Sequence, residues 1–173
     1  GCISFDERVR MQVPIRSKRN HLQTVVESLE ISRPRDKTDM YGIFRSVAES
    51  TPRRGMMILF SDLLADREGT MRGLKMLRQR GHDLLVFHVM DDDELDFPFN
   101  GATRFDGLES VDTVTCNPRA LREGYLQALQ SFLDELRRSC ASNTIDYALM
   151  RTSEPLDAAL AKFLSSRLHM QRS

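Results

Sequence analysis

The sequence has no excess charge of either sign and no long apolar segment. Lysine and arginine number 25, and aspartate and glutamate also number 25, so the formal net charge is zero. This balance argues against a nucleic-acid-binding protein that relies on a broad basic surface, and it excludes an acidic disordered chain. No apolar run approaches the roughly 18–20 residues that cross a bilayer, and no basic-then-apolar leader stands at the start. We therefore predict neither a membrane span nor a signal peptide in this segment.

Cysteines and the common catalytic motifs are also scarce. The three cysteines, Cys2, Cys116 and Cys140, are far apart, and no C-x-x-C motif or Cys/His pair at zinc spacing occurs. They are typical of small apolar residues in a reducing compartment, and we expect a cytoplasmic protein. The sequence has no G-x-S-x-G elbow, no phosphate-cradling glycine loop and no H-E-x-x-H. Nucleophilic and phosphoryl-transfer chemistry therefore lack a visible apparatus.

What is present is the composition of one globular domain. The 173 residues are 40% hydrophobic and 29% charged, which suits a single domain that folds without disulfides. Apolar periodicity predicts strands at residues 1–5, 8–15, 56–60, 83–90 and 145–150. Helices are expected at residues 17–31, 40–50, a segment that ends at Gly81, residues 118–142, and a terminal segment opened by Ser153 and Pro155.

The pattern of buried faces indicates the fold class. The runs at 56–60 and 83–90 are apolar without interruption, as expected for parallel strands buried on both faces. Residues 91–117 read as an irregular insert with a possible hairpin at 102–105 and 111–116. We predict an α/β domain with an open, mostly parallel sheet and helices on both faces. The inward stripe expected for the first helix is Leu22, Val25, Val26 and Leu29.

Three polar segments are predicted to meet at the carboxyl edge of this sheet, where ligands bind in such folds. They are Ser61-Asp62, the acidic run at 91–94, and Thr38-Asp39. Their oxygens could hold a hard cation such as Mg²⁺. The competing interpretations are that Asp62 or Asp66 caps the following helix, that Thr38 or Asp39 caps another, and that the acidic run is a solvated turn.

Two histidines are candidate site residues. His88 lies within an apolar strand and is expected to be a hydrogen-bonded core residue rather than a metal ligand. His82 follows the Gly81 stop and is expected to face water or the helix end.

Ordered motifs over nearly the whole chain resemble the bacterial family called domain of unknown function fifty-eight. The motifs are HLQTVVESLE, KTDMYGIFRSVAE, MMILFSDLLAD, RGHDLLVFHVMDDDELDFPF, NPRALREGYLQALQSF and IDYALMRTSEPLDAALAKFLSSR. Members of that family are similar to von Willebrand factor A domains and often accompany MoxR-type AAA+ ATPases. The resemblance implies a doubly wound, Rossmann-type domain that contacts partners through Mg²⁺ at the sheet edge.

The resemblance also implies a ligand set. Thr38 matches the threonine position of the A-domain metal site, and Asp62 matches its aspartate position. The Asp-x-Ser-x-Ser element of that site should precede Gly1, so we expect an N-terminally truncated domain that binds Mg²⁺ poorly. Absence of the first strand should also expose backbone groups and apolar faces of its neighbours.

The function expected from this resemblance is a non-enzymatic interaction module. It would work with a MoxR-like ATPase, assisting assembly or maturation of protein complexes. The alternative is a Mg²⁺-dependent hydrolase in which Asp62 and the carboxylates at 91–93 activate water. A phosphorylation-dependent receiver domain is disfavoured, because no lysine follows HVM or IDYALM.

Overall fold

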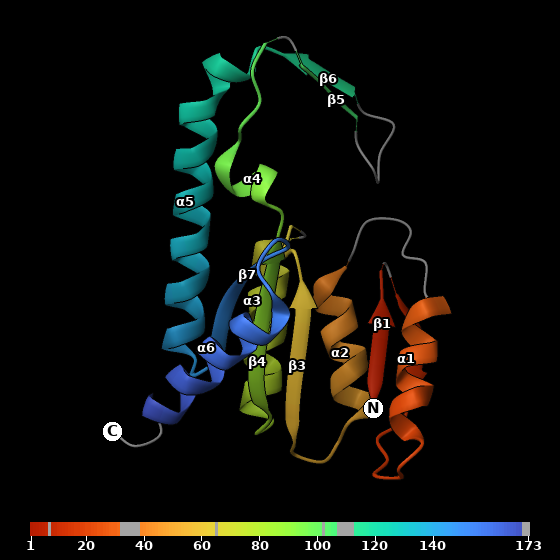
Figure 1. Ribbon diagram of the computed structural model, residues 1–173. Helices are drawn as coiled ribbons and strands as arrows, with labels where there is room; N and C mark the ends of the chain where they lie inside the picture. The colour runs from red at the N-terminus through yellow and green to blue at the C-terminus, as the bar shows by residue number, and fades with distance from the viewer. Residues whose placement is uncertain (7, 32–38, 65, 102, 107–112, 171–173) are drawn as a thin grey trace. The chain divides into compact units, whose positions relative to one another are not determined.

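The structure is a computed structural model that describes residues 1–6, 8–31, 39–64, 66–101, 103–106 and 113–170 (Figure 1). Its described residues form two compact units, one made mainly of residues 1–55 and 63–82, the other mainly of 56–62 and 83–170. Within these described ranges, no helix has the length and apolar character to span a membrane. In chain order the elements are β1 (Cys2–Phe5), β2 (Val9–Val13), α1 (His21–Ile31), α2 (Met40–Ser50), β3 (Met56–Ser61), α3 (Arg67–Gln79), β4 (Asp83–Met90), α4 (Asp92–Asp96), β5 (Thr103–Asp106), β6 (Thr113–Cys116), α5 (Pro118–Ser142), β7 (Asp146–Arg151) and α6 (Leu156–Met170).

The second unit contains a parallel three-stranded sheet in the order β3-β4-β7. Figure 1 shows the three arrows pointing the same way. Phe87 of β4 stands in register with Phe60 on one side and Ala148 on the other. The predicted parallel sheet is therefore confirmed, and β4 is its central strand. Val86 is fully buried there, as expected for a strand covered on both faces.

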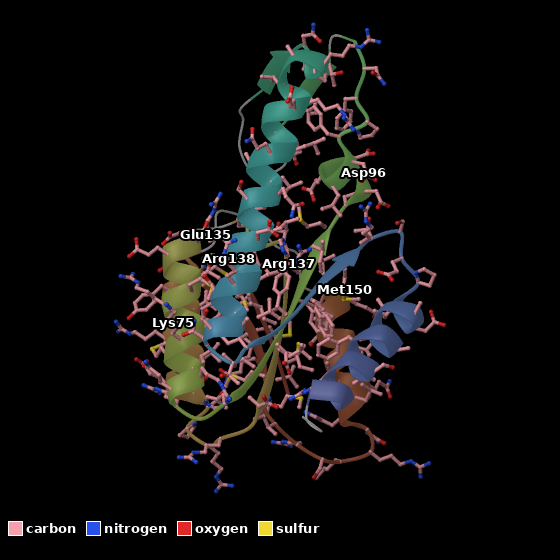
Figure 2. The ribbon with its side chains drawn as sticks, turned by 90° about the vertical axis from the view of Figure 1, so that its left-hand side faces the viewer. Lys75, Asp96, Glu135, Arg137, Arg138 and Met150 are labelled. Carbon is pink, nitrogen blue, oxygen red and sulfur yellow. The ribbon has the colours of Figure 1, made fainter. Side chains whose placement is uncertain are left out.

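Two helices cover opposite faces of this sheet. On one face, Leu85 and Phe87 pack with Ala159 and Phe163 of α6, and the rings of Phe87 and Phe163 meet edge to face at 5.3 Å. On the other face, the His88 ring lies edge-on to Phe132 of α5 at 5.8 Å. Figure 2 shows α5 and α6 on either side of the strands. The predicted α/β class with helices on both faces is confirmed.

Strand β3 differs from its prediction. It is an edge strand of the described sheet, and Met56, Ile58 and Phe60 are 57%, 49% and 58% exposed. The register places Ile58 and Phe60 beside Leu85 and Phe87, so they share the face that α6 covers. Because the α6 cluster is built on β4 and β7, it leaves the β3 side chains open. The uninterrupted apolar run correctly predicted the strand, but its prediction of burial on both faces was wrong for β3.

The insert at residues 91–117 contains the predicted hairpin, since β5 and β6 pair antiparallel. It also contains α4, a five-residue helix formed by the acidic run. The solvated-turn interpretation of that run was therefore wrong. The Asp91 carboxylate accepts a hydrogen bond from the Asp93 amide at 3.0 Å, and Glu94 accepts one from the Asp91 amide at 3.1 Å. This capping box explains the helix, because it satisfies amides that would otherwise lack partners.

In the first unit, β1 and β2 form an antiparallel pair and α1 follows. The predicted start of this helix at residue 17 was wrong, because α1 begins at His21. The predicted inward stripe was wrong as well: Leu22, Val26 and Leu29 are 73%, 47% and 54% exposed, whereas Ser28 is buried. The Ser28 hydroxyl donates to the Val25 carbonyl at 2.7 Å, which lets this polar side chain lie inward.

Helices α2 and α3 pack against each other in the first unit. Asp39 caps α2 by accepting from the Gly42 amide at 3.0 Å. Asp66 caps α3 by accepting from the amides of Glu68 and Gly69. Carboxylates suit these positions, because they face the positive end of the helix dipole. The capping interpretations of Asp39 and Asp66 are confirmed. Gly81 has φ +89° after α3, the left-handed conformation predicted from the sequence.

Candidate functional site

The candidate site is the carboxyl edge of the β3-β4-β7 sheet in the second unit. Each strand delivers polar residues there: Asp62 follows β3, Asp91 follows β4, and Arg151 and Thr152 end and follow β7. The strands are parallel, so these residues emerge at the same edge. Asp62 is exposed at this edge.

A pair of hydrogen bonds joins the ends of β4 and β7. The Thr152 amide donates to the Met90 carbonyl at 3.0 Å, and the Thr152 hydroxyl donates to the Asp91 carboxylate at 2.7 Å. The bond from Thr152, followed by the bond from the Asp93 amide, holds the pKa of Asp91 below its ordinary value. Asp91 thus closes the strand ends and caps α4 at the same time.

Arg151 connects β7 to the acidic helix. Its guanidinium donates to Asp92 at 2.6 Å and to both oxygens of Asp96 at 3.0 and 3.1 Å. The pKa of Asp92 is lowered by a hydrogen bond from Ser153 and then by Arg151, and the pKa of Asp96 is lowered by Arg151. These side chains remain 34–58% exposed, so the ion pairs position α4 more than they stabilise the fold.

Helix α4 is also held on α5. The Tyr125 hydroxyl donates to the Glu94 carbonyl at 2.9 Å, and Arg122 donates to the carbonyls of Phe97 and Asp96 at 3.2 and 3.0 Å. Figure 2 shows Asp96 in α4 beside α5. Helix α4 is therefore held from both sides. We call the polar residues at this edge the rim: Asp62, Asp91, Asp92, Asp96, Arg151 and Thr152.

Behind the rim, His88 forms two short hydrogen bonds. Its Nε2 lies 2.7 Å from the Asp62 carbonyl oxygen, and its Nδ1 lies 2.7 Å from the Tyr147 hydroxyl. The side chain is fully buried, and burial lowers the pKa of its imidazole. The expectation of a hydrogen-bonded core histidine is confirmed. Of the two alternatives for His82, the one facing water was wrong, because that side chain is only 1% exposed; its amide donates to the Leu77 carbonyl at the end of α3.

No observation places the predicted metal ligands Thr38 and Asp62 close together. Thr38 lies outside the described residues. In the parts of the chain that the structure describes, no three His, Cys, Asp or Glu side chains gather as a metal-binding group. Asp91, Asp92 and Asp96 are engaged by Thr152, Ser153 and Arg151. The described residues therefore do not fit the oxygen-rich shell that Mg²⁺ prefers.

Sequence reasoning missed the partners of the acidic run. Arg151 and Thr152 stand about sixty residues from Asp91 and Asp92, so local spacing does not connect them. The available signal was topological. An acidic segment after one strand and an Arg-Thr-Ser segment after a neighbouring parallel strand should meet at one edge.

Comparison with known proteins agrees with this architecture. The family model described as "Protein of unknown function DUF58" matches residues 1–132. A crystal structure of the conserved hypothetical protein BatB from Bacteroides thetaiotaomicron is similar, with a TM-score of 0.52 and 18% sequence identity. The alignment covers 99% of this chain and 78% of that chain. No curated protein matches the sequence. The structural similarity is one of fold, and it supports the von Willebrand factor A-like architecture expected from the sequence.

Proposed function

For this chain, which belongs to the DUF58 family of proteins of unknown function, we propose a non-enzymatic role. It is a protein-interaction module that docks partners on the rim. The observation that carries the proposal is the arrangement of the rim. Exposed charges of both signs are held at the ends of β4 and β7 by hydrogen bonds that do not depend on a partner, and Asp62 is exposed at the end of β3. A rigid charged surface gives specificity and orientation in protein recognition.

The partner we propose is a MoxR-type AAA+ ATPase, with assembly or maturation of other complexes as the process. This step rests on the family resemblance of the ordered motifs. The rim offers the chemistry for it: Asp62, Asp92 and Asp96 present carboxylates, and Arg151 presents a half-exposed guanidinium. A basic surface on the partner is the complement we expect.

The test is binding of purified chain to a MoxR-type ATPase from the same genome, measured by biolayer interferometry. We expect Asp62→Asn to weaken binding about tenfold, as removal of an interface charge commonly does. Glu135→Gln is the matched control, since Glu135 is an exposed carboxylate on α5 (Figure 2). Absence of binding by the wild-type chain, or equal loss in both variants, would contradict the proposal. Phosphoester turnover that disappears in Asp62→Ala would instead favour the hydrolase alternative.

Magnesium binding is a separate prediction. We expect this 173-residue chain to bind Mg²⁺ weakly, because the described residues supply too few converging oxygen ligands. Isothermal titration calorimetry with MgCl₂ measures this directly, with Asp62→Asn as the variant that removes the predicted ligand. Tight binding by the wild-type chain would overturn the prediction.

A further inference from the structure

We propose that His88 and Tyr147 are positioning residues that hold Asp62 at the rim. The inference rests on the proposed function, because that function makes the rim a docking surface. The hydrogen bonds that carry it do not depend on any partner. Both residues lie behind the exposed edge, on adjacent strands β4 and β7. Neither has been assigned a role by the sequence motifs discussed above.

The hydrogen-bond geometry determines the tautomer of His88. A carbonyl oxygen can only accept, so the His88 Nε2 that lies 2.7 Å from the Asp62 carbonyl must carry the proton. In a neutral ring Nδ1 then accepts, and the Tyr147 hydroxyl donates to it at 2.7 Å. The chain of donation therefore runs from Tyr147 through His88 to the backbone of Asp62.

The ring is also fixed sterically. Phe132 of α5 lies edge-on to it at 5.8 Å, and the Tyr147 ring lies at 5.9 Å. The charged groups that influence it electrostatically are Asp62 and Arg137 of α5. Both ring nitrogens are bonded and two aromatic rings pack edge-on with the imidazole, so its orientation is held and the Asp62 backbone is tethered to it.

The backbone after Asp62 shows why a tether is needed. Leu63 has φ +54°, a left-handed conformation that a leucine rarely adopts. Such backbone persists where the surrounding structure enforces it. The hydrogen bond to the preceding carbonyl is placed to enforce this turn, which begins at the exposed Asp62.

Two measurements on the free chain test the inference. Long-range ¹H–¹⁵N NMR spectra should show His88 with the proton on Nε2. Amide hydrogen exchange across residues 61–66, relative to amides of β4, should rise in His88→Leu by about fivefold to tenfold, as loss of one hydrogen bond implies. His88→Gln keeps a donor near the Nε2 position and should show a smaller rise. Tyr147→Phe should remove the partner of Nδ1 and leave the proton on Nε2, because the Asp62 carbonyl alone fixes the tautomer.

Phe132→Leu is the control, because it alters packing on the ring without removing either hydrogen bond. It should raise exchange across the sheet and not selectively at residues 61–66. A proton on Nδ1, or equal local exchange in His88→Leu and His88→Gln, overturns the inference. If these variants behave as expected while wild-type chain does not bind the ATPase, the positioning role stands and the proposed function fails.

Discussion

At the residue scale, burial determines the chemistry of Cys140. Its side chain is 1% exposed, and burial raises the pKa of its thiol to about 11. Below that pH the thiol stays protonated, and the thiolate is the reactive form. This agrees with the expectation from the sequence that the cysteines serve as small apolar residues.

We therefore expect iodoacetamide at mildly alkaline pH to modify the half-buried Cys2 well before Cys140 in the native protein. Peptide mass spectrometry after timed labelling measures the two rates. In guanidinium chloride the difference should vanish. Equal rates in the native protein would contradict the assignment of Cys140 to the core.

At the element scale, the junction of α4 with β7 should respond to pH. The pKa values of Asp91, Asp92 and Asp96 are lowered in the folded chain by hydrogen bonds from Thr152, Ser153 and Arg151. A lowered carboxyl pKa stabilises the folded state above the unfolded pKa of about 4, and this contribution is lost as the pH falls through the folded value. Arg151→Gln removes two of the pairs.

We expect the wild-type chain to lose stability more steeply than Arg151→Gln as the pH falls below about 4. Urea unfolding at a series of pH values measures the two slopes. Arg138→Gln, which removes an exposed charge from α5, should keep the wild-type slope (Figure 2). Parallel curves for wild type and Arg151→Gln would show that the ion pairs do not form in solution.

The contact between α2 and α3 depends on a glycine. A Cβ added at Gly73 would lie 2.2 Å from the buried Phe44 ring and 2.8 Å from the Phe44 Cβ. A Cβ at Gly124 of α5 would meet nothing within 4 Å. The same substitution should therefore have opposite effects in the two helices.

Gly73→Ala should destabilise the chain by about 1–3 kcal/mol, the usual cost of overpacking. Gly124→Ala should stabilise it by about 0.5–1 kcal/mol, because alanine restricts the unfolded chain and favours helix. Chemical denaturation gives both values. Stabilisation by Gly73→Ala would mean that the two helices do not approach as closely as the structure shows.

At the scale of the whole molecule, the open side of β3 affects solubility. Met56, Ile58 and Phe60 are about half exposed on an edge strand, an arrangement that favours aggregation. This exposure is a property of the fold rather than of any one side chain.

We expect Ile58→Lys to raise the concentration at which the chain begins to aggregate, measured by light scattering. A charge on an edge strand opposes pairing with another strand. Leu121→Lys is the control, because Leu121 is similarly exposed, at 51%, but lies on α5. Equal improvement by both variants would indicate a general charge effect instead of a role for the β3 edge.

The sequence by itself predicted the strands and the helices other than α4, the parallel sheet and the hairpin in the insert, and it offered Asp39 and Asp66 among the possible helix caps. These follow from apolar periodicity, chain direction and local hydrogen bonding, all of which act over a few residues. It also identified His88 as a core residue, because a histidine inside an apolar strand must have its nitrogens satisfied. It did not determine which face of α1 lies inward, since Leu22, Val26 and Leu29 form a regular stripe that is nevertheless exposed.

Only the tertiary structure decided the rest. The exposure of β3 depends on which strands flank it, and the links from Arg151 to Asp92 and from Tyr147 to His88 each span 59 residues. The strength of such contacts depends on distance in space, and that distance is set by strand register and helix packing. Local sequence patterns do not indicate strand register or helix packing. The rim and the hydrogen bonds behind it are therefore found only once the strands are paired.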